Sequence, residues 1–357
     1  MKGTLLLTLG VWTIAAMACG AAWGGSDGPG LDRWPAAKAN AWYAALPWMV
    51  GCNFIPSTAI NQLEMWQADT FDPKAIDREL GWAEGFGFNT VRVYLHDLAW
   101  EADAEGFKKR IDTFLGLAAK HGIRPFFVFF DDCWNENPTI GKQPEPIPSV
   151  HNSGWLQSPG KGVVNAPEAW GRLEGYVKGI VEAFAEDQRI LFWDLYNEPG
   201  NSGQGIKSLP LLEKAFAWAR AAKPAQPLSV GLWTGNRRLN EFQLEASDIV
   251  TFHNYNGTDS LSSQIAELKQ HGRPIFCTEW LRRGHSDVAT NLPIFKKEQV
   301  GCCNWGLVAG KTQTIWGWGT EEGAPEPELW FHDLLKQDGT PFDPKEKALF
   351  VELTARK

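Results

Sequence analysis

The strongest constraint on the fold of this chain is a repeated alternation of short apolar runs with segments of helical periodicity. Runs rich in β-branched and aromatic residues cover 48–54, 90–95, 124–131, 190–196, 229–234, 248–253, 274–280 and 302–307. Apolar residues at helical spacing lie between them and again near 343–353. Eight strands, each followed by a helix, predict an α/β fold, a (β/α)8 TIM barrel, in preference to a doubly wound sheet.

The N-terminus has the form of a targeting segment. A basic Lys2 precedes an apolar run at 5–17, and Ala16-Met17-Ala18 has the shape of a cleavage site. We therefore assign residues 1–25 to a secretory signal peptide and leader, and expect a secreted or periplasmic protein. Cys19, directly after Ala18, is also compatible with a lipid anchor at the cell envelope.

The remainder reads as one unit. Residues 34–357 contain no linker, low-complexity tract or composition break, so we expect a single barrel domain there. No apolar run in it reaches the length of a membrane span. Lys and Arg number 34 against 42 Asp and Glu, a net charge of −8 without a long basic cluster, which argues against a nucleic-acid partner.

Tryptophan is abundant, with 19 in 357 residues. A flat apolar ring with a polar edge is a surface on which sugar rings stack; the alternative is a core rich in Trp. The cysteines of the expected domain are Cys52, Cys133, Cys277, Cys302 and Cys303. They are odd in number and form no CxxC pair, so we expect small buried side chains rather than disulfides or metal ligands.

Polar or aromatic residues stand at the predicted C-terminal end of nearly every strand, where the active sites of such barrels lie. The candidate substrate-binding residues there are Asn53, Arg92, Asp132, Trp134, Asn197, His253, Tyr255 and Trp305. The two longest connections, 132–165 and 308–342, follow strands and so belong to the same face. Their Trp134, His151, Trp155, Trp316 and Trp318 could wall off one side of a cleft or form extra subsites in an open one; Trp316 is a further candidate for substrate binding.

Two carboxylates end very apolar strands. Glu198 follows residues 192–197 and Glu279 follows residues 275–278. Burying an ionised carboxylate costs several kcal/mol unless it is paired. Cleavage of a glycosidic bond needs two carboxyl groups, one to protonate the leaving oxygen and one to attack or to activate water. We therefore predict that Glu198 and Glu279 are catalytic.

At this point the sequence resembles a known family. Residues 193–199 (WDLYNEP) and 277–280 (CTEW) resemble the signature segments of glycoside hydrolase clan A, most closely family 5, the cellulase-like enzymes. The resemblance implies a retaining double displacement with Glu198 as acid/base and Glu279 as nucleophile. It extends to Arg92, His253, Tyr255 and Trp305. The histidine that many members carry after the third strand is not evident, since residues 131–134 read DDCW, which puts the substrate in doubt rather than the chemistry.

The partner residues fit this chemistry. Arg92 and the Tyr255 hydroxyl near Glu279 should keep it ionised and oriented. Asn197 can donate to a sugar 2-hydroxyl, a contact that strengthens in the transition state. Trp305 should form the floor under the reacting ring.

We thus expect a hydrolase of plant cell wall-type polysaccharides or oligosaccharides that needs no metal or cofactor. Carbohydrate is the one partner that the sequence indicates, and the sequence does not indicate an oligomeric state. The alternatives are an exo-acting glycosidase or furanosidase that releases a terminal or side-branch sugar from a pocket, a transglycosylase, and a non-catalytic carbohydrate-binding barrel, which would not need both glutamates. Metal hydrolysis has candidate ligands in His96-Asp97, Asp131-Asp132 and His253 but no HExxH spacing, and no GxSxG elbow is present.

Overall fold

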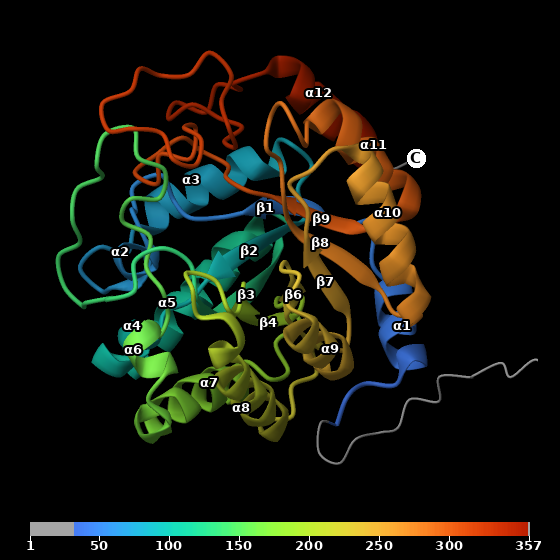
Figure 1. The fold of residues 1–357 in the computed structure, drawn as a ribbon. Coiled ribbons are helices and arrows are strands. Elements are labelled where there is room, and N and C mark those ends of the chain that lie inside the picture. Colours follow the sequence, from blue (N-terminus) through green and yellow to red (C-terminus); the bar gives the residue numbers. More distant parts are fainter. Residues whose placement is uncertain (1–31, 356–357) are drawn as a thin grey trace, which may run out of the picture. The chain divides into compact units, whose positions relative to one another are not determined.

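The computed structural model describes residues 32–355, in which a ring of parallel strands is surrounded by helices (Figure 1). The predicted signal peptide and Cys19 lie outside the described residues. Within residues 32–355, no helix combines the length and the apolar character needed to cross a membrane.

The strands form one parallel sheet in the order β5-β4-β3-β2-β1-β9-β8-β7-β6. They are β1 (Val50–Asn53), β2 (Thr90–Tyr94), β3 (Arg124–Asp131), β4 (Trp193–Asn197), β5 (Leu228–Ser229), β6 (Gly231–Leu232), β7 (Val250–His253), β8 (Ile275–Trp280) and β9 (Gly301–Asn304). Only Val230 separates β5 from β6, so these two pieces are the fifth strand of the barrel and the chain itself closes the ring. The predicted (β/α)8 barrel is confirmed.

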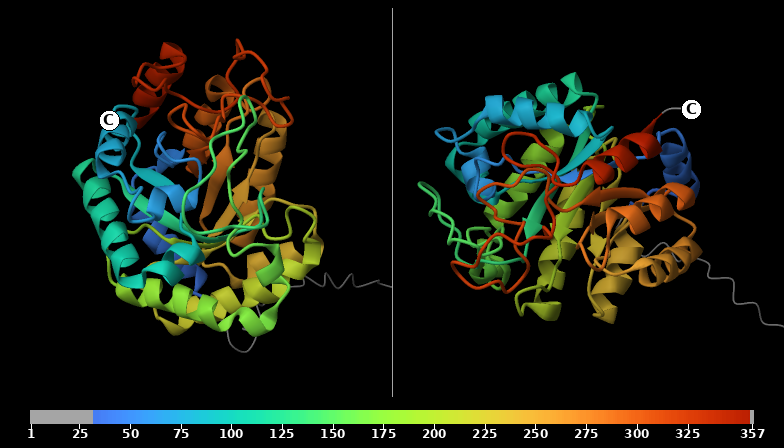
Figure 2. Two further views of the ribbon diagram at one scale, coloured as in Figure 1. Left: turned by 90° about the vertical axis from the view of Figure 1, so that its left-hand side faces the viewer. Right: turned by 90° about the horizontal axis from the view of Figure 1, so that it is seen from above.

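Helices cover the outside of this ring (Figures 1 and 2). They are α1 (Ala36–Ala44), α2 (Gln62–Trp66), α3 (Pro73–Glu84), α4 (Asp97–Ala102), α5 (Ala104–Lys120), α6 (Lys161–Val164), α7 (Gly171–Ala183), α8 (Leu209–Ala221), α9 (Arg237–Ala246), α10 (Thr258–Leu268), α11 (Val288–Glu298) and α12 (Pro344–Thr354). Apolar spacing predicts most of the long ones. It does not predict α9, which buries only Leu239, Gln243 and Ala246.

The interior of the barrel is layered. At its N-terminal end, the rings of Phe126, Phe192 and Phe276 pack together, with centroids 4.0–5.6 Å apart, and Ala39 of α1 belongs to the same cluster. The fully buried Arg92 occupies the barrel interior and pairs with Asp194 at 2.8 Å. The apolar layer closes one end of the barrel, which leaves the C-terminal ends of the strands for polar groups.

The two long connections lie beside each other over that end (Figure 1). The backbone N–H of Asn152 donates to the Thr312 carbonyl at 2.9 Å, and Gly323 donates to the Pro148 carbonyl at 3.0 Å. His151 bonds the Trp316 carbonyl through Nδ1 at 2.7 Å. These contacts join 132–165 to 308–342, and both lie on the expected face.

The five cysteines among the described residues are free and buried, as predicted.

Candidate active site

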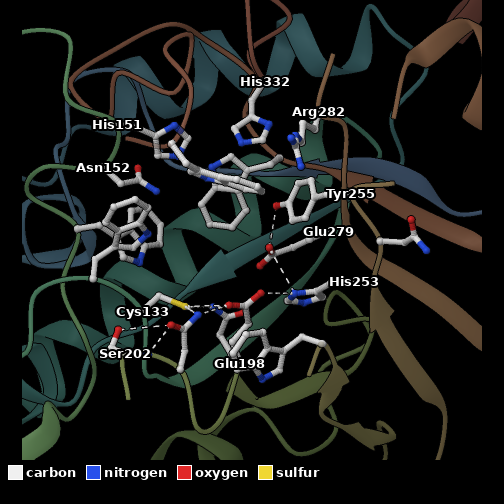
Figure 3. Close-up of a pocket in the computed structure, with 18 of the residues that line it drawn as sticks. Cys133, His151, Asn152, Glu198, Ser202, His253, Tyr255, Glu279, Arg282 and His332 are labelled. Carbon is white, nitrogen blue, oxygen red and sulfur yellow. Dashed lines mark hydrogen bonds and ion pairs between the residues drawn. The ribbon is translucent and has the colours of Figure 1, made fainter. Parts of the chain in front are cut away.

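A cavity of about 720 Å³ opens at the C-terminal ends of the strands (Figure 3). This volume is typical of small-molecule sites. Its lining residues come from strand ends and from both long connections: Cys133, Trp134, His151, Asn152, Trp155, Asn197, Glu198, Asn201, Ser202, Trp233, His253, Asn254, Tyr255, Asn256, Glu279, Arg282, Trp305, Trp318 and His332. The five tryptophans in this set place flat apolar rings around a polar centre, which suits sugar binding.

Glu279 is held by three donors. Its Oε1 accepts hydrogen bonds from Nη1 of Arg92 at 2.6 Å and from the hydroxyl of Tyr94 at 2.9 Å. Its Oε2 accepts from the hydroxyl of Tyr255 at 2.8 Å. Burial and the Glu279 charge raise the pKa of Tyr255 well above its usual value, so Tyr255 remains a donor. The carboxylate is thereby fixed in position; the sequence predicted Arg92 and Tyr255 beside Glu279 but not Tyr94.

Glu198 follows the last residue of β4 in a left-handed backbone conformation, with φ at 46°. Such a conformation is costly for a residue other than glycine, and strained residues of this kind cluster at active sites. Oε1 lies 2.9 Å from Nδ1 of His253, and Oε2 accepts from Asn201 at 2.5 Å and from the Cys133 thiol at 3.3 Å. Burial raises the pKa of Glu198, but the bonds from His253, Cys133 and Asn201 outweigh it and lower that pKa.

The two carboxylates lie close together. One oxygen of Glu198, one of Glu279 and a ring nitrogen of His253 all lie within 4.8 Å of one another. Among the described residues this is the one group with the spacing of a metal site. Its carboxylate oxygens receive hydrogen bonds from Arg92, Tyr255 and Asn201, so protein donors hold both carboxylates.

The alternative metal ligands are less accessible. Asp131 accepts from Cys133 N, Asn197 and Trp155, and burial raises its pKa to about 7. His96 accepts from the Leu98 N–H at 3.2 Å.

The structure brings five of the predicted substrate-binding residues to the cavity wall: Trp134, Asn197, His253, Tyr255 and Trp305. Arg92 and Asn53 lie behind Glu279 instead, where Arg92 donates to Asn53 Oδ1 at 3.2 Å and to Asn197 Oδ1 at 2.8 Å. Both can therefore act on a substrate only through the residues they hold.

Two predicted substrate contacts are corrected. Asp132 is fully buried and accepts hydrogen bonds from Tyr196 at 2.8 Å, from Gly200 N at 2.7 Å and from Ser208. These bonds fix the turn that follows Glu198, and burial raises the pKa of Asp132 to about 6. Trp316 does not line the cavity. Its indole donates to the Pro325 carbonyl at 3.1 Å, and Trp318 is the tryptophan of this loop that reaches the site.

Sequence reasoning missed several lining residues. Cys133 was expected only as a small buried side chain, yet its thiol contacts Glu198. Asn201 and Arg282 each follow a catalytic candidate by three residues, and this spacing is the one signal that could have found them. Trp233 lies in the apolar run 229–234 and His332 in the connection 308–342, and nothing in the sequence distinguishes either residue from its neighbours as a site residue.

A barrel with two adjacent carboxylates at its strand ends, inside a cavity walled by tryptophan, defines a glycoside hydrolase. The comparison with protein families agrees. The model of the cellulases, glycosyl hydrolase family 5, matches residues 74–320, and the chain belongs to this family.

Solved structures share the fold. A GH5_18 enzyme from Streptomyces cattleya, in complex with Manb1-4GlcNAc, is 13% identical with a TM-score of 0.57, over 85% of this chain and 80% of that one. An exo-beta-1,4-mannosidase from an Opitutaceae bacterium is 18% identical with a TM-score of 0.59, over 86% and 59%. An endo-beta-1,4-mannanase from Thermotoga petrophila is 14% identical with a TM-score of 0.55, over 86% and 76%. None of the curated proteins matches this sequence.

Proposed function

We propose that this hydrolase acts by a retaining double displacement, with Glu279 as the nucleophile and Glu198 as the acid/base. The observation that carries the proposal is the approach of the two carboxylates, which have oxygens within 4.8 Å of each other. Retaining enzymes hold their carboxyl groups about 5–5.5 Å apart, whereas inverting enzymes leave about 6.5–9.5 Å for a water molecule.

In the first step, Oε2 or Oε1 of Glu279 attacks the anomeric carbon and the glycosidic oxygen leaves with a proton from Glu198. Arg92, Tyr94 and Tyr255 orient the nucleophile. The amide of Asn197 lies on the cavity wall, where it is placed to bond a sugar hydroxyl.

In the second step, Glu198 removes a proton from water, which attacks the glycosyl-enzyme. A lowered pKa of Glu198 suits this role. For the first step, a sugar packed against Glu198 covers the 15% of its side chain still exposed, which favours the protonated form. The adjacent imidazole of His253, 2.9 Å away, supplies a path for that proton.

The joined loops favour release of a terminal sugar over internal cleavage. Trp134 stacks on His151, with centroids 5.5 Å apart, and His151 is tied to the 308–342 connection through the Trp316 carbonyl. These contacts support a wall on one side of the cavity, and a chain could not run through such a wall. We propose that the substrate is a glycan of the plant cell wall type and that the enzyme cleaves sugars from its chain end.

The roles of the glutamates are tested with an aryl glycoside whose leaving group needs little protonation. In Glu198→Ala the first step should survive, so we expect a burst of aryl alcohol followed by slow turnover. Azide needs no general base, so it should restore turnover and give a glycosyl azide of retained configuration. In Glu279→Ala we expect no burst, and azide should give the inverted product.

Glu174→Ala is the matched control, because Glu174 lies on the outer helix α7 with its side chain 47% exposed, and its kinetics should equal those of the wild type. An inverted azide product from Glu198→Ala and a retained one from Glu279→Ala would show that the two glutamates have the opposite roles. Near wild-type rates in both variants would remove both residues from the mechanism.

We also propose that the protein is exported through residues 1–25. The mass of the mature protein should show cleavage near Ala18, and a lipid on Cys19 would identify the anchored form. A cell-associated protein of full-length mass would contradict the proposal.

A further inference from the structure

Arg282 places a cation in the cavity without a protein partner (Figure 3). It follows β8 by two residues, after Leu281 in a left-handed conformation with φ at 79°. Its backbone N–H donates to the Ser286 carbonyl at 3.1 Å, which fixes where the side chain starts. Within residues 32–355, no carboxylate pairs with its guanidinium, and its Nε is buried without a hydrogen-bond partner.

The neighbouring Arg283 shows the contrast. It donates to both oxygens of Glu346, at 2.8 and 2.6 Å, and to the Trp330 carbonyl at 3.0 Å. Its charge is therefore compensated within the fold. The guanidinium of Arg282 instead lies 5.5 Å from the ring centroid of Trp318, which holds it against the wall with its donors free.

The groups that face Arg282 do not neutralise it. Trp318 and Tyr255 pack edge to face at 5.2 Å, and the Tyr255 hydroxyl is committed to Glu279. His332 packs on Trp318 at 5.8 Å, and its Nε2 is also buried and unpartnered in the described structure. Burial lowers the pKa of His332 well below its usual value, and the charges of Arg283 and Arg282 lower it further. His332 thus favours its neutral form, and Arg282 supplies the positive charge at this wall.

We propose, on the basis of the function proposed above, that Arg282 binds an anionic group of the substrate, a uronate carboxylate or a sulfate ester. A guanidinium offers a planar fork of donors that matches the oxygens of either group. A neutral sugar hydroxyl could accept one of these bonds but would leave the positive charge of Arg282 uncompensated once the sugar covers it.

The position of the anion follows from the contacts. Arg282 lies on Trp318, Trp318 packs on Tyr255, and Tyr255 bonds Glu279. The charged substituent therefore belongs to the sugar that contacts the nucleophile or to its neighbour on the Trp318 side. If the joined loops restrict the enzyme to chain ends, this sugar is the terminal one.

The test uses matched pairs of substrates. One arm compares oligosaccharides that contain uronic acids with the same compounds after reduction of their carboxyl groups to alcohols. The other compares sulfated oligosaccharides with their desulfated forms. For the wild type, Arg282→Gln and Arg282→Lys, kcat and KM are measured on each pair, and dissociation constants are measured in the inactive Glu279→Gln background.

We expect the wild type to prefer the anionic member of one arm, which identifies the anion as carboxylate or sulfate. Arg282→Gln should lose about 10- to 100-fold in kcat/KM on that member, mostly through KM, since it removes charge-assisted hydrogen bonds to the anion. On the neutral member it should change less than about threefold. Arg282→Lys should keep part of the preference for the anionic substrate. Arg237→Gln is the control, because Arg237 is exposed on α9, and it should keep the whole preference.

Equal losses on both members in Arg282→Gln would overturn the proposal, as would a wild type that favours the neutral member in every pair. Failure of the proposed glycoside hydrolysis would give a different result, because the wild type would then cleave no member of any pair and no activated aryl glycoside. In that case the dissociation constants still decide the anion site, because they do not depend on turnover.

Discussion

At the scale of single residues, two tryptophans at the ends of the neighbouring strands β8 and β9 differ in role, since one lines the cavity and the other packs in the core. Trp305 follows β9, lines the cavity, and contacts Tyr94 and Trp155 at centroid distances of 5.9 and 5.6 Å. Trp280, the last residue of β8, is fully buried and packs on Phe295. The same side chain therefore serves two purposes at neighbouring strand ends.

We expect Trp305→Leu to lower kcat/KM about tenfold or more, because leucine offers no flat face to the reacting sugar. Trp280→Leu should instead lower the melting temperature while leaving kcat/KM near the wild-type value, since it removes core contacts. Kinetics and thermal unfolding of both variants check this. A stability loss larger in Trp305→Leu than in Trp280→Leu, with unchanged kinetics, would contradict the assignment of Trp305 to the site.

Which site residues could be predicted depends on how the backbone places them. Glu198 and Glu279 are recognisable because each is a charge at the end of an apolar strand, where only pairing or chemistry explains it. Asp132 has the same sequence context, but the Tyr196 hydroxyl of β4 donates to one of its oxygens and the Gly200 N–H, in the turn after Glu198, donates to the other. Its role depends on a contact 68 residues along the chain, between Asp132 and Gly200, and no local pattern contains that information.

At the scale of elements, strands were easier to predict than helix ends. The apolar runs mark every barrel strand, since strands buried on both faces are continuously apolar. By contrast, Asn165 and Glu168 resemble a capping box for the following helix, yet Asn165 ends α6 and bonds Gln204. The 3-10 turn Pro167–Ala169 then intervenes before α7 begins at Gly171. Tertiary contacts here outweigh a local capping signal.

The joined loops give a prediction at the same scale. Gln313 accepts from the Ser149 N–H at 2.9 Å and donates to the Val150 carbonyl at 3.2 Å, but it does not line the cavity. Gln313→Ala should therefore loosen the contact between the loops without removing a substrate contact. We expect a KM increase of about three- to tenfold, longer products from a polysaccharide and faster proteolysis near residues 147–152, with the melting temperature lowered by a few degrees.

Gln226→Ala is the control for this loop variant. Gln226 makes comparable bonds, to Trp193 and to the Phe184 and Asp187 carbonyls, outside the cavity lining. It should lose stability with unchanged product lengths. Identical product lengths in wild type and Gln313→Ala would show that the loops do not set the mode of cleavage.

At the scale of the whole molecule, paired polar groups connect the core of the barrel to the site. Arg92 compensates Asp194 below and Glu279 above, and it bonds Asn197, which in turn donates to Asp131 at 3.0 Å. One network thus spans the barrel interior and the cavity. A change of charge at its buried members should be measurable in the unfolding of the entire chain.

Asp131 provides that measurement. Burial raises its pKa to about 7, against hydrogen bonds from Trp155 and Asn197. Between the unfolded pKa near 3.9 and pH 7 the folded state retains a proton that the unfolded state has lost, so this contribution to stability is complete below pH 3.9 and disappears as the pH rises through 7. Asp131→Asn cannot titrate. The free energy of unfolding of the wild type minus that of the variant should therefore fall between pH 5 and pH 7, by up to about 1.4 kcal/mol per pH unit, and stay level above pH 8. Urea unfolding at each pH measures this difference.

Asp187→Asn is the control for this prediction. Hydrogen bonds from Arg189 outweigh burial and lower the pKa of Asp187, so the difference in unfolding free energy between the wild type and Asp187→Asn should be constant over the same pH range. A difference for Asp131 that rises with pH would mean that its carboxylate, not its acid form, is what the folded barrel stabilises.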